Sequence, residues 1–214
     1  MPLDTLVRAR AGEHTAPADG KVRLHLGCGN DILAGWVNLD HAPAPGIDVV
    51  ADLGSCRIRP LPFADETVDE ILACHVLEHI ADILPLMAEL WRIAKPGAVL
   101  TAHVPYGSSD DAWEDPTHVR AYFLQSWGYY SQPYYWRSSG YGYHGDWQPE
   151  RVDLLIEEHR IGDPQTVVAR IDTERNMVRE MVATLIKVSP PRPASKELLR
   201  LPRVEAKPLK REDA

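Results

Sequence analysis

The sequence predicts an α/β protein built on an open, doubly wound, mostly parallel sheet. Short apolar runs that end on turn residues indicate strands at 21–26, 36–39 and 48–53. A strand, a long amphipathic helix and a second strand then follow between residues 68 and 104, which is the pattern of a βαβ unit. The 214 residues suit one domain of this class.

The βαβ unit is the clearest part of the pattern. A strand over 68–74 follows the turn-rich segment LPFADET. The helix is expected over 77–94, because its apolar residues recur at three- and four-residue spacing. Lys95, Pro96 and Gly97 end this helix, and an apolar strand is expected over 98–104. Two late strands, 152–157 and 182–188, are expected to close the sheet, with 166–171 as a further partner strand.

The character of the chain changes after this unit. Thirteen of the sixteen aromatic residues fall between Tyr106 and Trp147. We interpret 106–147 as an insertion after the fifth strand that forms either a lid and acceptor pocket or a minor core, since aromatic side chains bury large areas in either role.

Three regions are therefore expected. Residues 1–20 form a flexible N-terminal segment, residues 21–188 form the domain, and residues 189–214 form a Pro-rich basic tail that is mostly disordered or loosely docked. The tail from residue 187 holds eight Lys and Arg against four Asp and Glu, whereas residues 1–186 hold fifteen against twenty-seven.

Composition excludes several classes of function. A body this acidic repels a phosphate backbone, so we expect no nucleic-acid partner. The chain has no apolar run long enough to span a membrane and no apolar leader near its start, so neither a membrane partner nor export is expected. The chain has three cysteines, an odd number, and they lack CxxC spacing: Cys28, Cys56 and Cys74. This pattern favours a reducing, cytoplasmic location.

The sharpest local feature is a strand that runs into two glycines, Gly27 and Gly29. Such a turn lets a ligand approach bare backbone N–H groups. Asp40 ends the second strand, where an acidic side chain accepts the ribose hydroxyls in dinucleotide-type folds. At the end of the third strand, Asp52 could accept from the exocyclic amine of an adenine while the Leu53 N–H meets a ring nitrogen.

The segments LHLGCGN, GWVNLD, VVADL, PLPFADETVDEILACHVLEHI and RIAKPGAVLTAHVP occur in this order over about residues 21–105. As a set they resemble successive motifs of the class I S-adenosylmethionine-dependent methyltransferases. The resemblance implies a Rossmann-like methyltransferase fold with about seven strands, the last antiparallel, and the cofactor S-adenosylmethionine lying across the ends of the first four. The chain departs from the family pattern at His25, where an acidic residue is usual, and at Asp31, where a third glycine is common.

Carried over by position, the resemblance implies a set of cofactor contacts. The Gly27 and Gly29 turn would face the methionine part, Asp40 the ribose, and Asp52 and Leu53 the adenine. Backbone carbonyls of Cys74 and His75 would meet the methionine amino group. The expected cofactor-binding residues are Gly27, Cys28, Gly29, Asn30, Asp40, Asp52, Leu53, Cys74 and His75.

The residues expected to act on the acceptor lie in the segment WEDPTHVR. His118 could remove a proton from an acceptor hydroxyl or amine, with Asp115 holding its tautomer, so both are predicted to be catalytic. The alternative is a helix cap at Asp115 with a hydrogen-bonded His118. His75 and His79 flank Glu78 at metal-pair spacing, and Asp110, Asp111, Asp115, His118 or His144 could supply a third ligand. We nevertheless predict no metal, because loop carboxylates are commonly plain solvated charge.

The sequence thus favours a methyltransferase that acts on an oxygen or nitrogen of a small-molecule or sugar-like acceptor in biosynthesis. The alternative is a non-catalytic S-adenosylmethionine-binding regulatory or assembly partner. A nicotinamide-dependent oxidoreductase is disfavoured because Ile32 stands where a GxGxxG motif would have its last glycine. The connections around the second strand are too short for crossover helices, so part of the sheet should lack cover, and we expect a homodimer to bury it.

Overall fold

The computed structural model describes residues 19–138 and 140–209. The expected flexible segment 1–20 therefore lies almost wholly outside the described residues. The strands are β1 (Arg23–Leu26), β2 (Val37–Asp40), β3 (Val49–Val50), β4 (Val68–Cys74), β5 (Ala94–Pro105), β6 (Trp147–Glu157), β7 (Glu180–Lys187) and β8 (Arg203–Leu209). The helices are α1 (Ile83–Ile93), α2 (Asp111–Glu114) and α3 (Pro164–Thr173), with 3-10 turns η1 (Leu53–Ser55), η2 (Leu77–His79), η3 (Leu124–Tyr130), η4 (Gln132–Arg137), η5 (Glu158–Arg160) and η6 (Lys196–Leu198).

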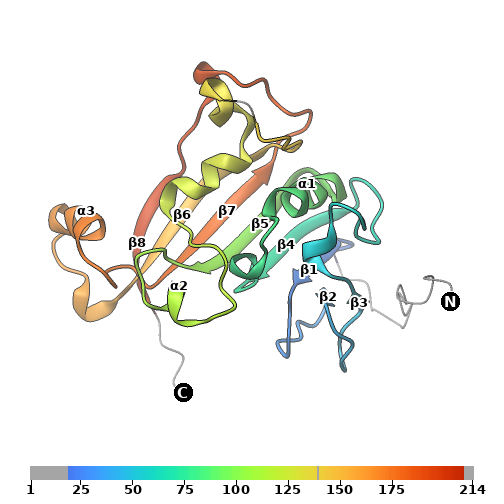
Figure 1. The fold of residues 1–214 in the computed structure, drawn as a ribbon, viewed down its shortest axis with the longest axis horizontal. Coiled ribbons are helices and arrows are strands. Elements are labelled where there is room, and N and C mark those ends of the chain that lie inside the picture. The colour runs from blue at the N-terminus through green and yellow to red at the C-terminus, as the bar shows by residue number, and fades with distance from the viewer. Residues whose placement is uncertain (1–18, 139, 210–214) are drawn as a thin grey trace.

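The strands form one sheet in the order β3-β2-β1-β4-β5-β7-β6-β8 (Figure 1). Strands β1 to β5 pair in parallel, and β7 is antiparallel to both of its neighbours, β5 and β6. The parallel strands all end at the same edge of the sheet, so the loops that follow β1, β2, β3 and β4 meet there. This confirms the Rossmann-like α/β class, with an eighth strand added to the expected seven.

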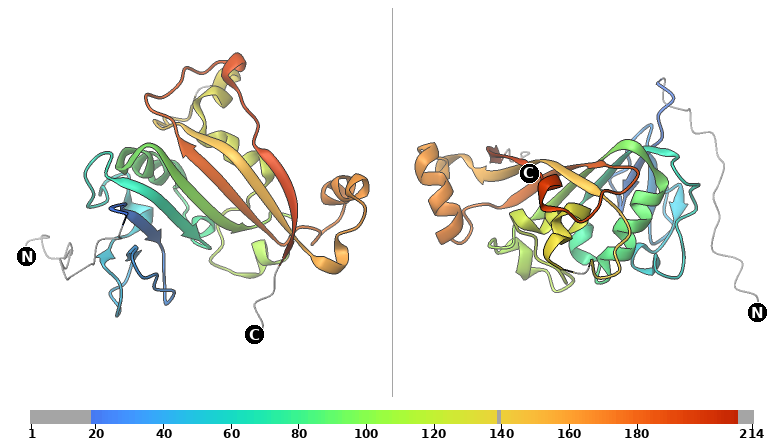
Figure 2. Two further views of the ribbon diagram at one scale, coloured as in Figure 1. Left: turned by 180° about the vertical axis from the view of Figure 1, so that it is seen from behind. Right: turned by 90° about the horizontal axis from the view of Figure 1, so that it is seen from above.

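One face of the sheet carries the core. Leu24, Ile71, Leu100 and Leu185 are fully buried and lie in register across β1, β4, β5 and β7. Helix α1 packs on this face with its apolar residues inward, and the helical turns of 124–137 lie on the same side (Figure 2). The helix is shorter than the expected 77–94, because residues 77–79 form the separate turn η2.

The second face is only half covered. Leu72, Val99, Thr101, Thr184 and Ile186 alternate with the core residues and are half-buried. A doubly wound sheet has helices on both faces, whereas the long helix of the described residues covers one face and leaves these side chains partly accessible.

The short connections around β2 are closed by their own polar contacts. Asn38 is 2% exposed, and its amide donates to the carbonyls of Leu33 and Trp36, while its oxygen accepts from the Leu33 N–H. The neighbouring His25 is 1% exposed. The region around β2, where the short connections predicted a lack of cover, is therefore covered. The part of the sheet that is only half covered is instead the second face of β4, β5 and β7.

Two expectations about the last third of the chain are wrong. Residues 166–171 belong to helix α3 rather than to a strand. The tail is not wholly loose, because Arg203–Leu209 forms β8, paired in parallel with β6 at the edge opposite β3 (Figure 1). Arg151 pairs with Glu205, and Lys207 pairs with Asp153, so the spaced charges that suggested disorder form ion pairs between β6 and β8.

The aromatic insertion is largely core. Trp127 and Tyr122 are buried and stacked with ring centroids 5.1 Å apart, and Tyr130, Tyr135 and Tyr143 join the same core. Among the described residues, no helix is long and apolar enough to cross a membrane.

Candidate active site

The glycine turn after β1 is built as the sequence predicts. Gly27 and Gly29 have φ values of +57° and +51°, in the left-handed region that favours glycine. A Cβ on Gly27 would lie 2.3 Å from Cγ2 of Val76, so this glycine lets the loops after β1 and β4 pack closely. A Cβ on Gly29 would meet no heavy atom within 4 Å, which leaves open space beside its backbone. The turn therefore has the room that a ligand against the main chain requires.

Asp40 lies at the same edge and contacts this turn directly. Its Oδ2 accepts from the Gly29 N–H at 2.9 Å, and its Oδ1 accepts from the His41 N–H at 2.7 Å. Burial opposes ionisation of this carboxyl, but these N–H donors, with that of Ala42, lower its pKa overall. Asp40 is thus a fixed carboxylate held against the glycine turn.

The residues after β3 and β1 complete this edge. The Asp52 side chain accepts from the Gly54 N–H at 2.9 Å and caps η1, whose first residue, Leu53, has a buried side chain. Cys28 is buried and donates its N–H to the Leu39 carbonyl, whereas Asn30 is exposed. Burial raises the pKa of the Cys28 thiol to about 11, so it stays neutral.

His75 follows β4 in a strained conformation, with φ of +48°. Its Nε2 lies 3.4 Å from Glu180 Oε1, and its Nδ1 lies 3.5 Å from Glu78 Oε1. Contact with Glu180, followed by contact with Glu78, raises the pKa of His75 to about 10. The adjacent Cys74 is kept neutral, since burial raises its pKa to about 11.

Glu180, at the start of β7, also reaches His103, whose Nδ1 lies 3.1 Å away. Burial opposes the ionisation of Glu180, but His103 and His75 outweigh it and lower its pKa to about 2. The Glu180 carboxylate therefore joins the carboxyl ends of β4 and β5 to the amino end of β7.

A cavity of about 490 Å³ opens beside His75. His75 and Glu180 line it from the sheet, and Asp115 and His118 line it from the insertion. Its remaining lining residues are Pro105, Asp111, Glu114, Glu157, Arg179 and Leu209. The structure thus brings both predicted catalytic residues to the same cavity as one predicted cofactor residue.

The DPTH segment combines the two alternatives left open by the sequence. Asp115 Oδ1 accepts from the Thr117 N–H at 2.7 Å and from its hydroxyl, which is the turn-capping role. His118 is 9% exposed in its side chain, with Nε2 3.8 Å from Asp115 Oδ2. Its Nδ1 is buried and makes no hydrogen bond, so His118 is not the satisfied core histidine of the structural alternative.

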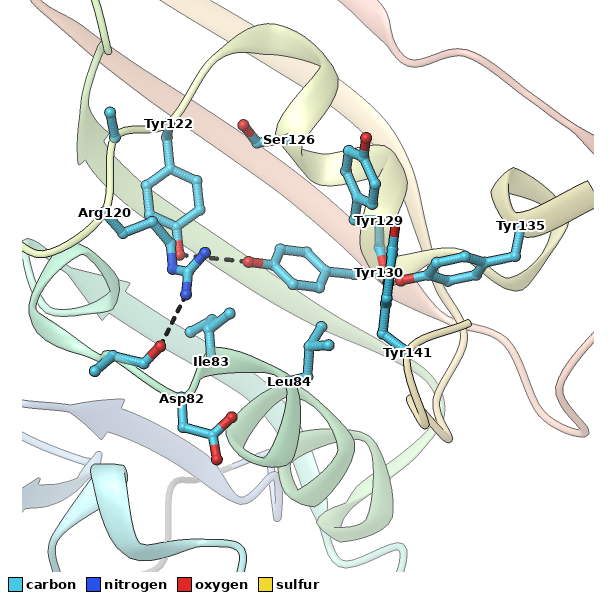
Figure 3. A pocket seen from close by; sticks show the side chains of 12 residues that line it. Asp82, Ile83, Leu84, Arg120, Tyr122, Ser126, Tyr129, Tyr130, Tyr135 and Tyr141 are labelled. Atoms are coloured by element: carbon cyan, nitrogen blue, oxygen red, sulfur yellow. Dashed lines mark hydrogen bonds between the residues drawn. The ribbon is translucent and has the colours of Figure 1, made fainter. Parts of the chain in front are cut away.

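A second cavity, of about 390 Å³, lies under the tyrosine-rich turns (Figure 3). Tyr129, Tyr130, Tyr135 and Tyr141 line one side of it. On the other side Arg120 donates to the Ala81 carbonyl at 3.0 Å. The aromatic insertion therefore supplies both a minor core and the wall of a cavity.

Sequence reasoning missed Glu180, His103 and Arg179. His103 lies on β5, Glu180 on β7 and Arg179 just before β7, and no local spacing in the sequence connects them with the segment around His75. Only the pairing of β5 with β7 brings them to the site, and a single sequence does not specify that pairing.

Comparison with known proteins identifies the domain. Residues 24–102 match the family model described as "Methyltransferase domain". An uncharacterized methyltransferase of Mycobacterium avium (strain 104) is 33% identical over 128 residues, covering 50% of this chain and 49% of that protein. A protein of Mycolicibacterium smegmatis described as "Probable S-adenosylmethionine-dependent methyltransferase" is 26% identical over 118 residues, 47% of this chain and 46% of that protein. This chain thus spans about half the length of the curated relatives that it matches.

The fold agrees with these matches. A crystal structure of a SAM-dependent methyltransferase from Archaeoglobus fulgidus aligns with a TM-score of 0.56 and 14% identity, covering 78% of this chain and 87% of that one. The matched segment holds the glycine turn, Asp40, Asp52 and His75, which are the residues that meet at the carboxyl edge of the sheet. Its motifs, its sheet and its relatives thus make residues 24–102 of the chain similar to the class I S-adenosylmethionine-dependent methyltransferases.

Proposed function

We propose that this chain is an S-adenosylmethionine-dependent methyltransferase that methylates an oxygen or nitrogen of a small-molecule or sugar-like acceptor. The observation that carries the proposal is the position of the 490 Å³ cavity. It starts at His75, beside the expected methionine end of the cofactor, and extends over the ends of β5, β6 and β7. An acceptor in this cavity would lie beside the segment that is expected to hold the methionine end of the cofactor, and so close to the transferred methyl group.

The residues of the carboxyl edge fit the cofactor. The open space beside Gly29 suits a ligand placed against the main chain, and the fixed carboxylate of Asp40 suits the ribose hydroxyls. Asn30, Asp52, Leu53 and Cys74 would complete its binding site. When bound, S-adenosylmethionine supplies an activated methyl group with its own leaving group. The protein therefore needs no covalent nucleophile, in keeping with the raised pKa values of Cys28 and Cys74.

The cavity lining suggests the acceptor class. Asp111, Glu114, Arg179 and Glu180 offer charged groups that hydrogen-bond hydroxyls or amines. We assign Asp115 and His118 to the acceptor side of the reaction, because both line the cavity. Such a polar cavity favours a hydroxyl-rich or amine-bearing metabolite, and a cytoplasmic biosynthetic role remains part of the proposal.

Two measurements test the function. Calorimetry should show binding of S-adenosylhomocysteine, and a panel of sugar, phenol and amine acceptors should yield S-adenosylhomocysteine from S-adenosylmethionine. No binding of either cofactor form would reject the proposal. Binding without turnover on any acceptor would instead support the non-catalytic regulatory or assembly role.

A further inference from the structure

We propose that Glu78, His79 and His118 bind one divalent transition-metal ion at the wall of the acceptor cavity. One potential ligand atom from each side chain lies within 4.8 Å of the other two. Glu78 and His79 come from η2, which follows β4, and His118 comes from the insertion, so the ion would join two segments that are distant in sequence.

The first observation is the state of Glu78. Glu78 is 1% exposed, and neither of its carboxylate oxygens has a hydrogen-bond partner. The charged neighbour of Oε1 is His75, whose Nδ1 is 3.5 Å away, beyond a good hydrogen bond. A buried carboxylate is costly unless it is paired, hydrogen-bonded or bound to a metal. Oε1 of Glu78 has only the long contact with His75 and Oε2 has no hydrogen-bond partner, so this carboxylate can supply a ligand atom.

The second observation is the orientation of the two histidines. His79 Nδ1 lies 2.9 Å from the Thr117 hydroxyl and 3.3 Å from its carbonyl oxygen, which leaves Nε2 as the ligand atom. His118 has the complementary arrangement, because Nε2 faces Asp115 at 3.8 Å while the buried Nδ1 has no partner. Metal-binding histidines usually direct their second ring nitrogen toward a carbonyl or a carboxylate in this way.

The ligand set indicates the class of ion. Two imidazoles and one carboxylate suit Zn²⁺ and the related transition metals, whereas Mg²⁺ and Ca²⁺ prefer oxygen ligands alone. Zinc bonds of about 2.0–2.2 Å in tetrahedral geometry place ligand atoms roughly 3.4 Å apart. The ligand atoms of the three side chains thus need to approach one another by about an ångström when the ion binds. A local adjustment of the rotamers is enough for this.

The backbone around the three residues is already docked. The Val119 N–H donates to the Glu78 carbonyl at 3.0 Å, and Arg120 donates to the Ala81 carbonyl at 3.0 Å. The His79 and His118 rings meet edge to face with centroids 4.7 Å apart. The ion would therefore bind to a largely preformed site, with His118 rather than His75 as the second imidazole, whereas the sequence predicted no metal.

The ion would fix the DPTH segment on η2 and so set the wall of the acceptor cavity, to which His118 belongs. The role of the ion toward the acceptor rests on the proposed function, whereas the binding of the ion does not depend on it.

The test is a titration of the tag-free, chelator-treated full chain with Co²⁺, followed by visible absorption, and with Zn²⁺, followed by calorimetry. We expect one ion per chain and a tetrahedral or five-coordinate Co²⁺ spectrum. Glu78→Gln and His118→Asn should each weaken binding by about 100-fold or more, and Asp115→Asn by about 10-fold, as loss of a residue behind the ligands does. His144→Asn, at an exposed histidine away from the site, is the matched control and should bind as the wild type does.

A stoichiometry below one ion per chain, or equal affinity in wild type, Glu78→Gln and His118→Asn, would overturn the proposal. Circular dichroism of each variant checks folding, and anomalous diffraction at the zinc edge locates the ion without relying on variants. S-adenosylhomocysteine affinity is measured on the same samples. If it persists while no ion binds, the metal site alone is rejected. If it is absent while the ion binds, the proposed function alone is rejected.

Discussion

His75 and Glu180 lie 3.4 Å apart at the carboxyl edge of the sheet, one after β4 and the other at the start of β7. The strand order places β5 between β4 and β7, and His103 of β5 contacts the same carboxylate. Glu180 therefore links three neighbouring strands at the carboxyl edge of the sheet, where it also lines the 490 Å³ cavity. Removing the charge of Glu180 should loosen both this edge of the sheet and the wall of the cavity.

We expect Glu180→Gln to lower the free energy of unfolding by about 1–2 kcal/mol at neutral pH, because hydrogen bonds to a charged group are lost. The pKa of Glu180 is about 2 in the folded protein, below the ordinary value of 4.5. The part of the stability that depends on ionisation of Glu180 is thus present above pH 4.5 and is lost as the pH falls toward 2. Urea unfolding of both proteins should show a difference that shrinks over this range, and a difference independent of pH would contradict this role.

Asp40→Ala should weaken binding of S-adenosylhomocysteine by about 1–3 kcal/mol, through loss of charge-assisted bonds to the ribose. The control is Asp40→Asn, which keeps an acceptor for the Gly29 N–H and removes the charge. Calorimetry on both variants separates the two effects. If only Asp40→Ala weakens binding, Asp40 organises the glycine turn, and an unchanged dissociation constant in both would remove Asp40 from the site.

His118→Ala should lower turnover by roughly 100-fold or more while leaving cofactor affinity nearly unchanged. The reason is its position, since it lines the acceptor cavity and not the glycine turn. Single-turnover kinetics with a chosen acceptor measures the effect. A loss of thermal stability with unchanged turnover would favour the turn-capping alternative, and loss of wild-type turnover on chelation would attribute the effect to a bound ion.

The backbone geometry of the carboxyl edge was predictable because its signals are local. The Gly27 and Gly29 turn and the strand-end position of Asp40 follow directly from the order of residues along the chain. The neighbours of His75 and the pairing of β8 were not predictable, because they depend on strand partners that one sequence does not reveal. The segment 166–171 was misassigned for a related reason, since its apolar residues fit a short strand as well as a helix and only the surrounding fold decides between them.

The ion pairs of β8 give a test of the tail. Asp153 on β6 accepts from Lys207 at 2.9 Å and from Arg151 at 2.7 Å, and although burial opposes its ionisation, these contacts lower its pKa. Asp153→Asn should release β8 at a cost of about 1 kcal/mol, seen as faster proteolysis of the tail. Because the folded pKa is lowered, wild-type β8 should itself loosen as the pH falls below the ordinary value of 3.8. Equal proteolysis rates in both proteins would show that backbone pairing alone holds the strand.

The half-covered face of the sheet bears on assembly. Leu72 and Val99 are half-buried there on parallel strands, which are normally covered on both faces, and Ile186 is half-buried beside them on the antiparallel β7. We expect a homodimer to bury this face, since two-fold dimers are the commonest oligomers. Val99→Lys should shift the protein toward monomer, whereas Val168→Lys, at an exposed position on α3, should not. Light scattering over a wide dilution series measures both. A wild-type protein that is strictly monomeric at high concentration would show that this face needs no second copy.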